Sequence, residues 1–568
     1  MKQLFYICFT LLLVSNIWAQ SNEIPLPSQA QLSWHETERI MFVHFGMATW
    51  QAREYDNHTT DLSTVNPRKL NTDQWCEVAK SWGAKMIIFV AKHTGGFCWW
   101  QTETSDYGVK EIPWRNGKGD VMKDLSKSCK KYGLALGVYI YPGDDNWGAG
   151  IGSGGICEDP SKQEAYNKIF RQQLTEVLSR YGKISEVWFD GNCKIPVSDI
   201  LEKYAKDAVV FQGSDASLRW VGNEDGVAPY PNWYTLSTKD LKTGVATALA
   251  STQEGDAYAP VEIDVPLLKN KGHKWFWAPN TDSIILTTSQ LMKLYYNSVG
   301  RGSNLLLNST PDTNGLIPQS HVKAYKDFGK EIDKRFSKAK KGNLLFEGNT
   351  FTLNFKKTEK INHIVLQEDL SKGQLIQSFE IYYNDNGVKR LLTKGLSVGS
   401  KRIIYFDDIL TNQIFLTTTK TRENKTPKLD IKAFYVTTDL DDLRNKDNKI
   451  KEQSISYWEQ ESFNPESFTD IKLDLTKYVN SIGEYILSFS PIAYDYSSGK
   501  SWGLEFKDIQ LEIYGASHPE LIEQINPWEF KITRSQQTLD EFKTIFKAKI
   551  KNNGANSTGE IKIKRISY

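Results

Sequence analysis

The sequence predicts an α/β fold: a (β/α)8-like barrel followed by two all-β sandwich domains. Residues 40–213 alternate short apolar runs with longer amphipathic stretches, which is typical of strands and helices in a parallel sheet. The runs are almost wholly apolar, which indicates a sheet covered on both faces. After about residue 340 the helical period stops and short strand-like runs continue. A chain of 568 residues also exceeds what one hydrophobic core usually supports.

The strands expected in the first part end on polar or aromatic side chains. The first four close on His44, His93, Tyr141 and Asp190, which stand 48 or 49 residues apart, and a fifth strand, "DAVVFQG", follows. In a (β/α)8 barrel the carboxyl ends of all strands meet on one face, where the chemistry is built. An open doubly wound sheet would gather these residues less completely. The barrel is therefore favoured over the open sheet.

The expected boundaries divide the chain into five segments. Residues 1–19 are predicted to be a signal peptide, because Lys2 precedes the 11-residue apolar stretch "LFYICFTLLLV" and the small Ala19 offers a cleavage site. This stretch is too short to cross a bilayer, so we expect an exported protein, periplasmic or secreted, without membrane insertion. The remaining segments are the barrel at 20–339, a β-sandwich at 340–437, a linker at 438–455 and a second β-sandwich at 456–568, for which carbohydrate binding is the hypothesis.

The composition excludes several classes of function. Charged residues make up 24% and nearly cancel to +2, so no global field attracts nucleic acid. The six cysteines are scattered without metal spacing, so neither a disulfide scaffold nor a metal or other cofactor is expected; a Cys157–Cys193 pair is left open. The stretch "GIGSGG" at 150–155 matches a nucleotide-binding pattern, but no helix starts on its last glycine, so a loop is favoured.

Two carboxylates are candidates for one polar pocket. Asp190 ends the run "EVWFD", and Glu224 lies in the loop "RWVGNEDG" after the fifth expected strand. Two carboxylates that face one cleft with aromatic rings and histidines, and without a metal cluster, are typical of glycoside hydrolysis. Neighbouring strand-end loops can supply the two environments that a charged nucleophile and a protonated acid require. Glu262, in the strand-like "EIDV", remains a competing acid.

A set of motifs resembles glycoside hydrolase family 29, the retaining α-L-fucosidases. "VHFG", "NGKGDVMKDL", "GLALGVYIYP", "EVWFDG", "RWVGNE" and "SVGRGSNLLLNSTPDTNGLIP" occur in the family's order, and the match covers about residues 31–437. The resemblance implies that Asp190 is the nucleophile and that Glu224 is the acid/base of the subgroup acting on α-1,3/1,4-linked fucose. The other candidate substrate-binding residues are His44, Glu54, His93, Tyr139, Trp220 and Trp277.

The resemblance therefore implies an exo-acting α-L-fucosidase that hydrolyses terminal α-1,3/1,4-linked L-fucose from oligosaccharides or glycoconjugates by double displacement. The two carboxyl groups are expected about 5–5.5 Å apart, as retention requires. No metal or cofactor is needed, because protonation and nucleophilic attack supply the chemistry.

Two segments depart from the family pattern. The family's KHHDGF is "KHTGGF" here, with Thr94 for the second histidine and Gly95 for the acid, and "PLLKNKGHKWFW" lacks the family's arginine. Both segments line the sugar site in the family, so these departures bear on specificity. Two alternatives stay open: a non-catalytic glycan-binding protein on a decayed barrel, and a related glycosidase that accepts L-galactose.

Overall fold

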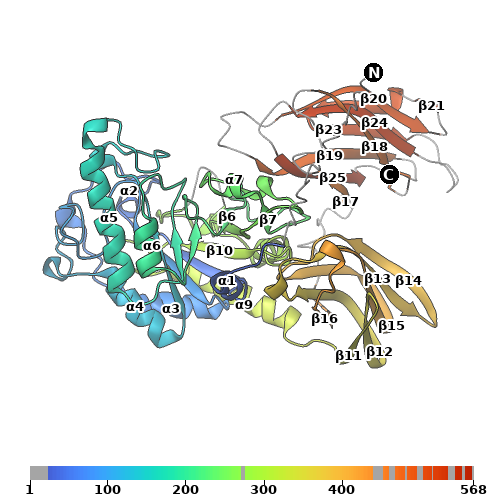
Figure 1. Cartoon of the computed structure of the whole chain (residues 1–568), viewed down its shortest axis with the longest axis horizontal. Helices are drawn as coiled ribbons and strands as arrows, with labels where there is room; N and C mark the ends of the chain where they lie inside the picture. Colours follow the sequence, from blue (N-terminus) through green and yellow to red (C-terminus); the bar gives the residue numbers. More distant parts are fainter. Residues whose placement is uncertain are drawn as a thin grey trace, which may run out of the picture.

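The computed structural model describes residues 24–269, 275–438, 452–458, 467–476, 478–479, 483–494, 503–513, 516–517, 519–534, 544–552 and 557–565. Over these residues the chain forms three units of secondary structure, drawn from blue to red in Figure 1. The first unit alternates strands and helices, and the other two consist of antiparallel sheets. The predicted signal peptide 1–19 and most of the predicted linker 438–455 lie outside the described residues.

The first unit is built on an eight-stranded parallel sheet whose strands follow the order of the chain. The strands are β1 (Arg39–Val43), β2 (Met86–Lys92), β3 (Ala135–Ile140), β4 (Glu186–Trp188), β5 (Val209–Phe211), β6 (Arg219–Trp220), β9 (Val261–Val265) and β10 (Asn304–Ser309). β10 pairs with β1, and a single parallel bridge between Phe211 and Leu218 joins the two remaining edges. The predicted barrel is therefore confirmed, and the open sheet is not what forms.

Helices surround this sheet. They are α1 (Gln29–His35), α2 (Ala48–Gln51), α3 (Thr72–Ser81), α4 (Val121–Tyr132), α5 (Gln163–Arg180), α6 (Ser198–Tyr204), α7 (Thr238–Leu241), α8 (Thr288–Asn297) and α9 (Gln319–Phe336). Residues 212–218, all of them described, join β5 to β6 without a helix. Glu224 was expected to follow the fifth strand and instead follows the short sixth one, because two residues of β6 pair with β9.

Local sequence explains where the helices begin and end. Asn71 precedes α3, and its side chain accepts hydrogen bonds from the first backbone N–H groups of the helix. Asp120 caps α4 in the same way, through the N–H of Lys123. These caps satisfy donors that the first turn of a helix leaves without partners. α4 ends at Gly133, whose φ of 65° is a left-handed conformation that glycine adopts without strain.

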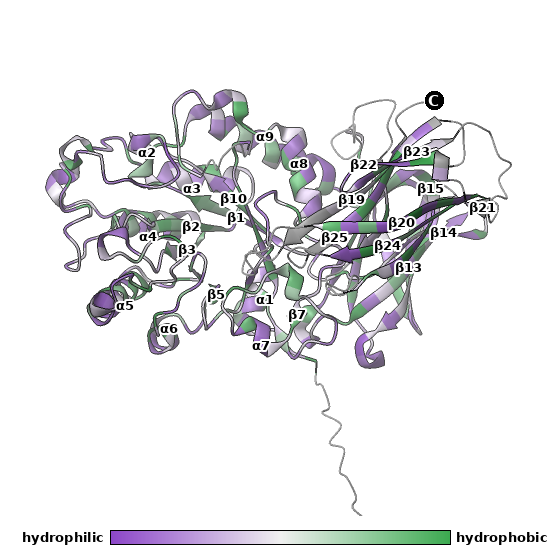
Figure 2. Ribbon diagram, turned by 90° about the horizontal axis from the view of Figure 1, so that it is seen from above, coloured by the Kyte–Doolittle hydropathy of each residue, from purple (hydrophilic) through white to green (hydrophobic). Residues whose placement is uncertain are grey.

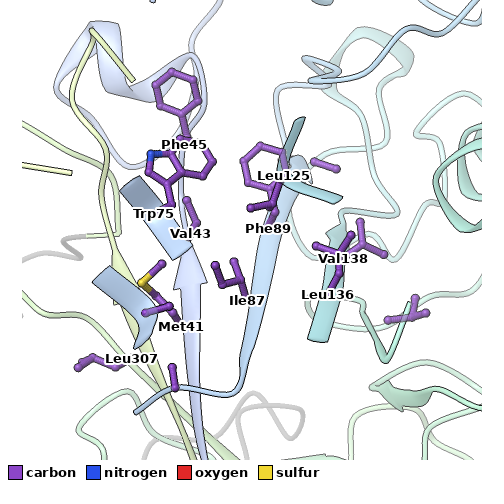
Figure 3. Close-up of a cluster of buried hydrophobic side chains, with 14 of the residues drawn as sticks. Met41, Val43, Phe45, Trp75, Ile87, Phe89, Leu125, Leu136, Val138 and Leu307 are labelled. Atoms are coloured by element: carbon purple, nitrogen blue, oxygen red, sulfur yellow. The ribbon is translucent and has the colours of Figure 1, made fainter. Parts of the chain in front are cut away.

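Strand alternation divides the barrel core into two layers. Figure 3 shows the outer layer, where Met41 of β1 and Phe89 of β2 lie with Val138 of β3 against Trp75 of α3 and Leu125 of α4. Residues of the opposite parity fill the interior: Ile40, Phe42, Met86, Ile88, Val90, Tyr139 and Trp188. Because side chains alternate between faces, each strand delivers every second residue toward the barrel axis.

An irregularity in β2 changes this alternation just before His93. The pairing of β2 with β3 shifts register between Val90 and Lys92. The buried ammonium of Lys92 therefore faces the helix layer, where it donates to Gln173 Oε1 at 3.0 Å and to the Tyr166 hydroxyl at 3.3 Å. The next residue, His93, faces the interior. A bulge of this kind re-aims side chains and is common beside active sites.

Two antiparallel units complete the chain. The second unit contains β11 (Gly342–Glu347), β12 (Thr350–Glu368), β13 (Ile376–Asp385), β14 (Val388–Gly395), β15 (Arg402–Thr421) and β16 (Leu429–Phe434). The third pairs one sheet, β17 (Glu452–Trp458), β25 (Ser557–Arg565), β19 (Gly483–Tyr494), β23 (Glu529–Arg534) and β22 (Ile522–Asn526), with another, β18 (Thr469–Asp474), β24 (Thr544–Asn552), β20 (Leu504–Ile513) and β21 (Ala516–Ser517). The sandwich folds expected after the barrel are confirmed.

The two β units lie on the side of the barrel away from α2, which follows β1 (Figure 2). Tyr457 of the third unit contacts Tyr230 of the first, with ring centroids 5.4 Å apart and edge to face. β17 begins at Glu452, inside the segment for which the sequence predicted a linker.

The cysteines of the described residues are free and buried, so the Cys157–Cys193 pair that the sequence left open is not formed. In the described part of the chain, no helix is both long and apolar enough to cross a membrane.

Candidate active site

A cavity of about 170 Å³ opens among the carboxyl ends of the barrel strands. This volume exceeds the roughly 30 Å³ share of one water several times but lies below the roughly 300 Å³ of typical drug-sized sites. The cavity therefore suits one small ring. It is lined by Phe42, His44, Glu54, Tyr55, His93, Tyr139, Trp188, Asp190, Gly191, Phe211, Gln212, Trp220, Glu224, Asp264 and Trp275.

Asp190 is delivered to this cavity two residues beyond β4. Gly191 turns the chain with a φ of 70°, and its N–H donates to Gln212 Oε1 at 2.7 Å, which fixes the turn. The hydroxyl of Tyr139 donates to Asp190 Oδ2 at 3.1 Å. Burial raises the pKa of Asp190 to about 6, and the nearby Glu224 adds to this, while the Tyr139 hydrogen bond opposes it. Asp190 is therefore ionised above about pH 6, as a nucleophile must be.

Glu224 lies in the loop that follows β6. The loop is held by Asn223, whose side chain accepts from the Asp225 N–H at 3.1 Å and donates to the carbonyl of Val227 at 3.0 Å. The indole N–H of Trp275 contacts Glu224 Oε2 at 3.4 Å. The two predicted carboxyls thus line one cavity, and both residues are partly exposed there.

Asp264 adds a further carboxyl group to the cavity lining. The indole N–H of Trp220 donates to Asp264 Oδ1 at 2.6 Å. Burial, with Glu224 as the next cause, raises the pKa of Asp264 well above its usual value. The sequence signal was present, since Asp264 has the parity of Glu262 on one strand. Asp264 is not among the site residues that the sequence predicts.

Glu262, the competing acid, lies beneath the cavity and not on its wall. It is fully buried, and Trp188 Nε1 donates to its Oε1 at 2.8 Å. Burial raises its pKa to about 7. Glu186 is equally buried, accepts from Trp34 Nε1 at 3.0 Å, and has a pKa that burial and Glu262 raise well above normal. Glu262 therefore supports Trp188 from inside the barrel.

His44 and His93 present neutral imidazoles. Burial lowers the pKa of His44 well below 6.5, and that of His93 to about 4. His44 Nδ1 lies 2.7 Å from Asn308 Oδ1, an acceptor, so Nδ1 carries the proton and Nε2 accepts. An accepting imidazole nitrogen at a cavity wall can receive a hydrogen bond from a sugar hydroxyl.

Five rings form a continuous row along the cavity. The centroids of Tyr55 and His93 lie 6.0 Å apart and those of His93 and Tyr139 5.7 Å apart, with the planes within 25° of parallel. The row continues from Tyr139 to Trp188 at 5.3 Å and from Trp188 to Phe211 at 4.0 Å. Alternating polar edges and apolar faces of this kind suit a sugar, which has hydroxyls and C–H faces.

Glu54 is held by the backbone of Trp275. Both of its carboxylate oxygens accept from the backbone N–H of Trp275, at 3.1 and 3.0 Å. The carbonyl of Trp275 in turn accepts from Asn308 Nδ2 at 2.8 Å. Of the predicted substrate-binding residues, Trp277 is not among the residues that line the cavity, whereas Trp275, in the same "WFW" stretch, is.

The sequence thus identified seven of the lining residues and missed the others. Asp190, Glu224, His44, Glu54, His93, Tyr139 and Trp220 are brought together as expected. Trp188 carried a usable signal, because it precedes Asp190 by two residues on the same strand face. Tyr55, Gln212 and Trp275 carried none. Among the described residues, no group of three or more His, Cys, Asp or Glu side chains could hold a metal ion.

The barrel, the paired carboxyls and the single-ring cavity define a glycoside hydrolase. A family profile described as alpha-L-fucosidase matches residues 26–335. Alpha-L-fucosidase 1 of Arabidopsis thaliana is 31% identical over 464 residues, which cover 72% of this chain and 88% of that protein. A putative alpha-L-fucosidase of Oryza sativa is 27% identical and covers 67% of this chain and 80% of its own. The chain belongs to the α-L-fucosidase family.

Solved structures agree with this assignment. The crystal structure of a putative alpha-L-fucosidase from Bacteroides thetaiotaomicron has a TM-score of 0.67 and 31% identity, and covers 73% of this chain and 100% of its own. A putative alpha-L-fucosidase from Bacteroides ovatus has a TM-score of 0.64 and 25% identity, and covers 93% of this chain and 95% of its own. The second match therefore extends into the last β unit.

Proposed function

We propose that this protein is an exported, exo-acting, retaining α-L-fucosidase that releases terminal α-1,3/1,4-linked L-fucose from oligosaccharides or glycoconjugates. The observation that carries the proposal is the pair Asp190 and Glu224 in one cavity sized for a single ring. Membership in the family supports fucose as the sugar. The motif around Glu224 resembles the α-1,3/1,4 subgroup, and the apolar amino-terminal stretch supports export.

The proposed reaction has two steps. In the first, a carboxylate oxygen of Asp190 bonds to the anomeric carbon as the glycosidic C–O bond breaks, and the departing oxygen takes a proton from Glu224. In the second, Glu224 accepts a proton from water, whose oxygen bonds to the anomeric carbon and releases Asp190. Asp190, which the Tyr139 hydroxyl contacts, suits the covalent role, and Glu224, on the loop after β6, suits exchange with the leaving group and water.

Hydrolysis of a panel of α-1,2-, α-1,3-, α-1,4- and α-1,6-fucosylated oligosaccharides tests the substrate. We expect turnover of the α-1,3 and α-1,4 members, and α-L-fucose as the first anomer in a proton NMR time course. β-L-fucose as the first anomer would contradict the covalent role of Asp190. Binding without turnover would favour the non-catalytic alternative, and faster cleavage of an aryl α-L-galactoside than of the fucoside would favour L-galactose.

A further inference from the structure

Gly95, where the sequence departs from the family motif, leaves a space that is filled by another residue. A Cβ atom on Gly95 would stand 2.5 Å from Oδ2 of Asp56 and 2.6 Å from its Cβ. Non-bonded carbon atoms pack best at about 3.5–4.0 Å, so a side chain at position 95 cannot coexist with Asp56 as placed. Gly95 is not among the glycines with positive φ, so it is needed for space and not for backbone conformation.

The carboxylate of Asp56 is held by three donors. Gln51 Nε2 donates to its Oδ1 at 2.7 Å, the N–H of His58 donates to the same oxygen at 2.9 Å, and the hydroxyl of Tyr107 donates to Oδ2 at 2.6 Å. Gln51 ends α2, and Tyr107 lies in the connection after β2. Hydrogen bonds to a charged acceptor are the stronger kind. Asp56 therefore ties the loop after β1 to the loop after β2.

Three consecutive residues of this loop contact three different parts of the site. Glu54 accepts from the Trp275 N–H, Tyr55 stacks on His93, and Asp56 lies against Gly95. Glu54 and Tyr55 line the sugar cavity, whereas Asp56 does not. Asp56 therefore does not line the cavity, and it acts on the cavity wall through Glu54 and Tyr55 of its own loop and through its place beside His93.

We propose that Asp56, seated on Gly95, is a positioning residue that holds Glu54 and Tyr55 in the sugar cavity. The carboxyl group of Asp56, from the loop after β1, occupies the space beside Gly95 in the loop after β2. This inference rests on the proposed function, because it concerns the binding of L-fucose in that cavity.

A carboxyl swap tests the proposal in the full-length protein. Asp56→Gly and Gly95→Asp should each raise KM for an aryl α-L-fucoside, and the Kd of L-fucose by calorimetry, about tenfold, while kcat falls less than about threefold. The double variant Asp56→Gly/Gly95→Asp returns one carboxyl to the same space from the other loop. It should recover at least half of the lost affinity on a logarithmic scale, which is strong coupling between the two positions.

Three comparisons make the result decisive. Asp106→Asn, at an exposed acid beside Tyr107, is the matched control and should keep wild-type KM and Kd. If the swap variants fail to fold by circular dichroism, Asp56→Asn, which keeps the size but not the charge, should still raise Kd about threefold. The proposal would be overturned if the losses of L-fucose affinity were additive in the double variant. It would also be overturned if Asp56→Asn and Asp106→Asn had the same Kd. Wild type that binds L-fucose without hydrolysing fucosides would instead reject the proposed function.

Discussion

The hydroxyl of Tyr139 donates a hydrogen bond to Asp190 Oδ2 across 3.1 Å, from β3 to the loop after β4. A hydrogen bond to the ionised carboxylate lowers its pKa and so opposes the burial that raises the pKa of Asp190 to about 6. The acidic limb of kcat/KM should therefore lie near pH 6, because only ionised Asp190 attacks. Tyr139→Phe removes the opposing bond, so this limb should move to higher pH, by about one unit.

The measurement is a pH profile of kcat/KM from pH 4.5 to 8.5 with an aryl α-L-fucoside. The loss in Tyr139→Phe should be larger at pH 5.5 than at pH 8. Tyr141→Phe is the control, since the Tyr141 hydroxyl accepts from the Gly152 N–H and does not contact Asp190. A limb that stays in place or moves to lower pH would show that the bond does not set the titration of Asp190.

Glu224 and Glu262 are distinguished by their dependence on the leaving group. Glu224→Gln should reduce kcat/KM on natural glycans by about 10²–10⁴-fold, because a sugar alcohol leaves only when protonated. It should slow the first step on activated aryl fucosides far less, and azide should restore turnover by replacing the activated water. Asp190→Asn should abolish the hydrolysis of both substrates.

Glu262→Gln is the comparison, because Glu262 lies under the cavity floor and not on its wall. It should show neither the leaving-group dependence nor the azide rescue. If Glu262→Gln shows both and Glu224→Gln stays near wild type, the acid/base assignment is wrong.

Stability should depend on pH through the same buried glutamate. The folded-state pKa of Glu262 is about 7, above the ordinary 4.5 expected on unfolding. The folded state therefore holds a proton that the unfolded state has lost, and the unfolding free energy falls as pH rises from about 4.5 to 7. Glu262→Gln carries no such proton and can still contact Trp188. The unfolding free energy of this variant relative to that of wild type should therefore rise by about 1–3 kcal/mol between pH 5 and pH 8.

Urea unfolding at both pH values measures this gain. Glu111→Gln, at an exposed glutamate, should show no change in its difference from wild type between the two pH values. If the unfolding free energy of Glu262→Gln relative to wild type falls from pH 5 to pH 8, Glu262 is not protonated in the folded state.

Trp275 and Trp277 give the last prediction. Trp275→Phe removes the indole N–H that lies 3.4 Å from Glu224 but keeps the backbone N–H that binds Glu54. We expect about a threefold loss of kcat/KM on natural glycans and a smaller one on activated aryl fucosides, because a long hydrogen bond is weak. Trp277→Phe, outside the cavity lining, should remain near wild type. A larger loss in Trp277→Phe than in Trp275→Phe would contradict this placement.

Much of the site could be predicted because the site residues of a barrel follow directly after its strands in the sequence. His44, His93 and Asp190 stand just beyond β1, β2 and β4, and parallel strands bring such residues to one face. The motif "RWVGNE" added Glu224 to these predicted site residues. The strand parity that places Trp188 and Asp264 in the cavity was also readable, since it needs only alternation from Asp190 and Glu262.

Other features could not be predicted, because they depend on residues far apart in sequence. Whether Glu262 or Asp264 reaches the cavity depends on how deep each lies along the barrel axis, and strand pairing sets that depth. The bulge that turns His93 inward and Lys92 outward is visible only in the register between β2 and β3. Trp275 was passed over for Trp277 because their types and neighbours are alike, and only the contacts with Glu54 and Asn308 separate them.

By itself, then, the sequence determined the barrel, the family and the two carboxyls, because these follow from local periodicity and short motifs. The tertiary structure alone decided that Asp264 lines the cavity and that Glu262 lies beneath it. It also decided that Asp56 fills the space beside Gly95. The physical reason is that the space beside a residue, and the burial of its side chain, depend on segments from several parts of the chain. A missing side chain becomes a gap or a contact only when the facing loop is in place, and a carboxyl acquires its pKa from neighbours that folding brings to it.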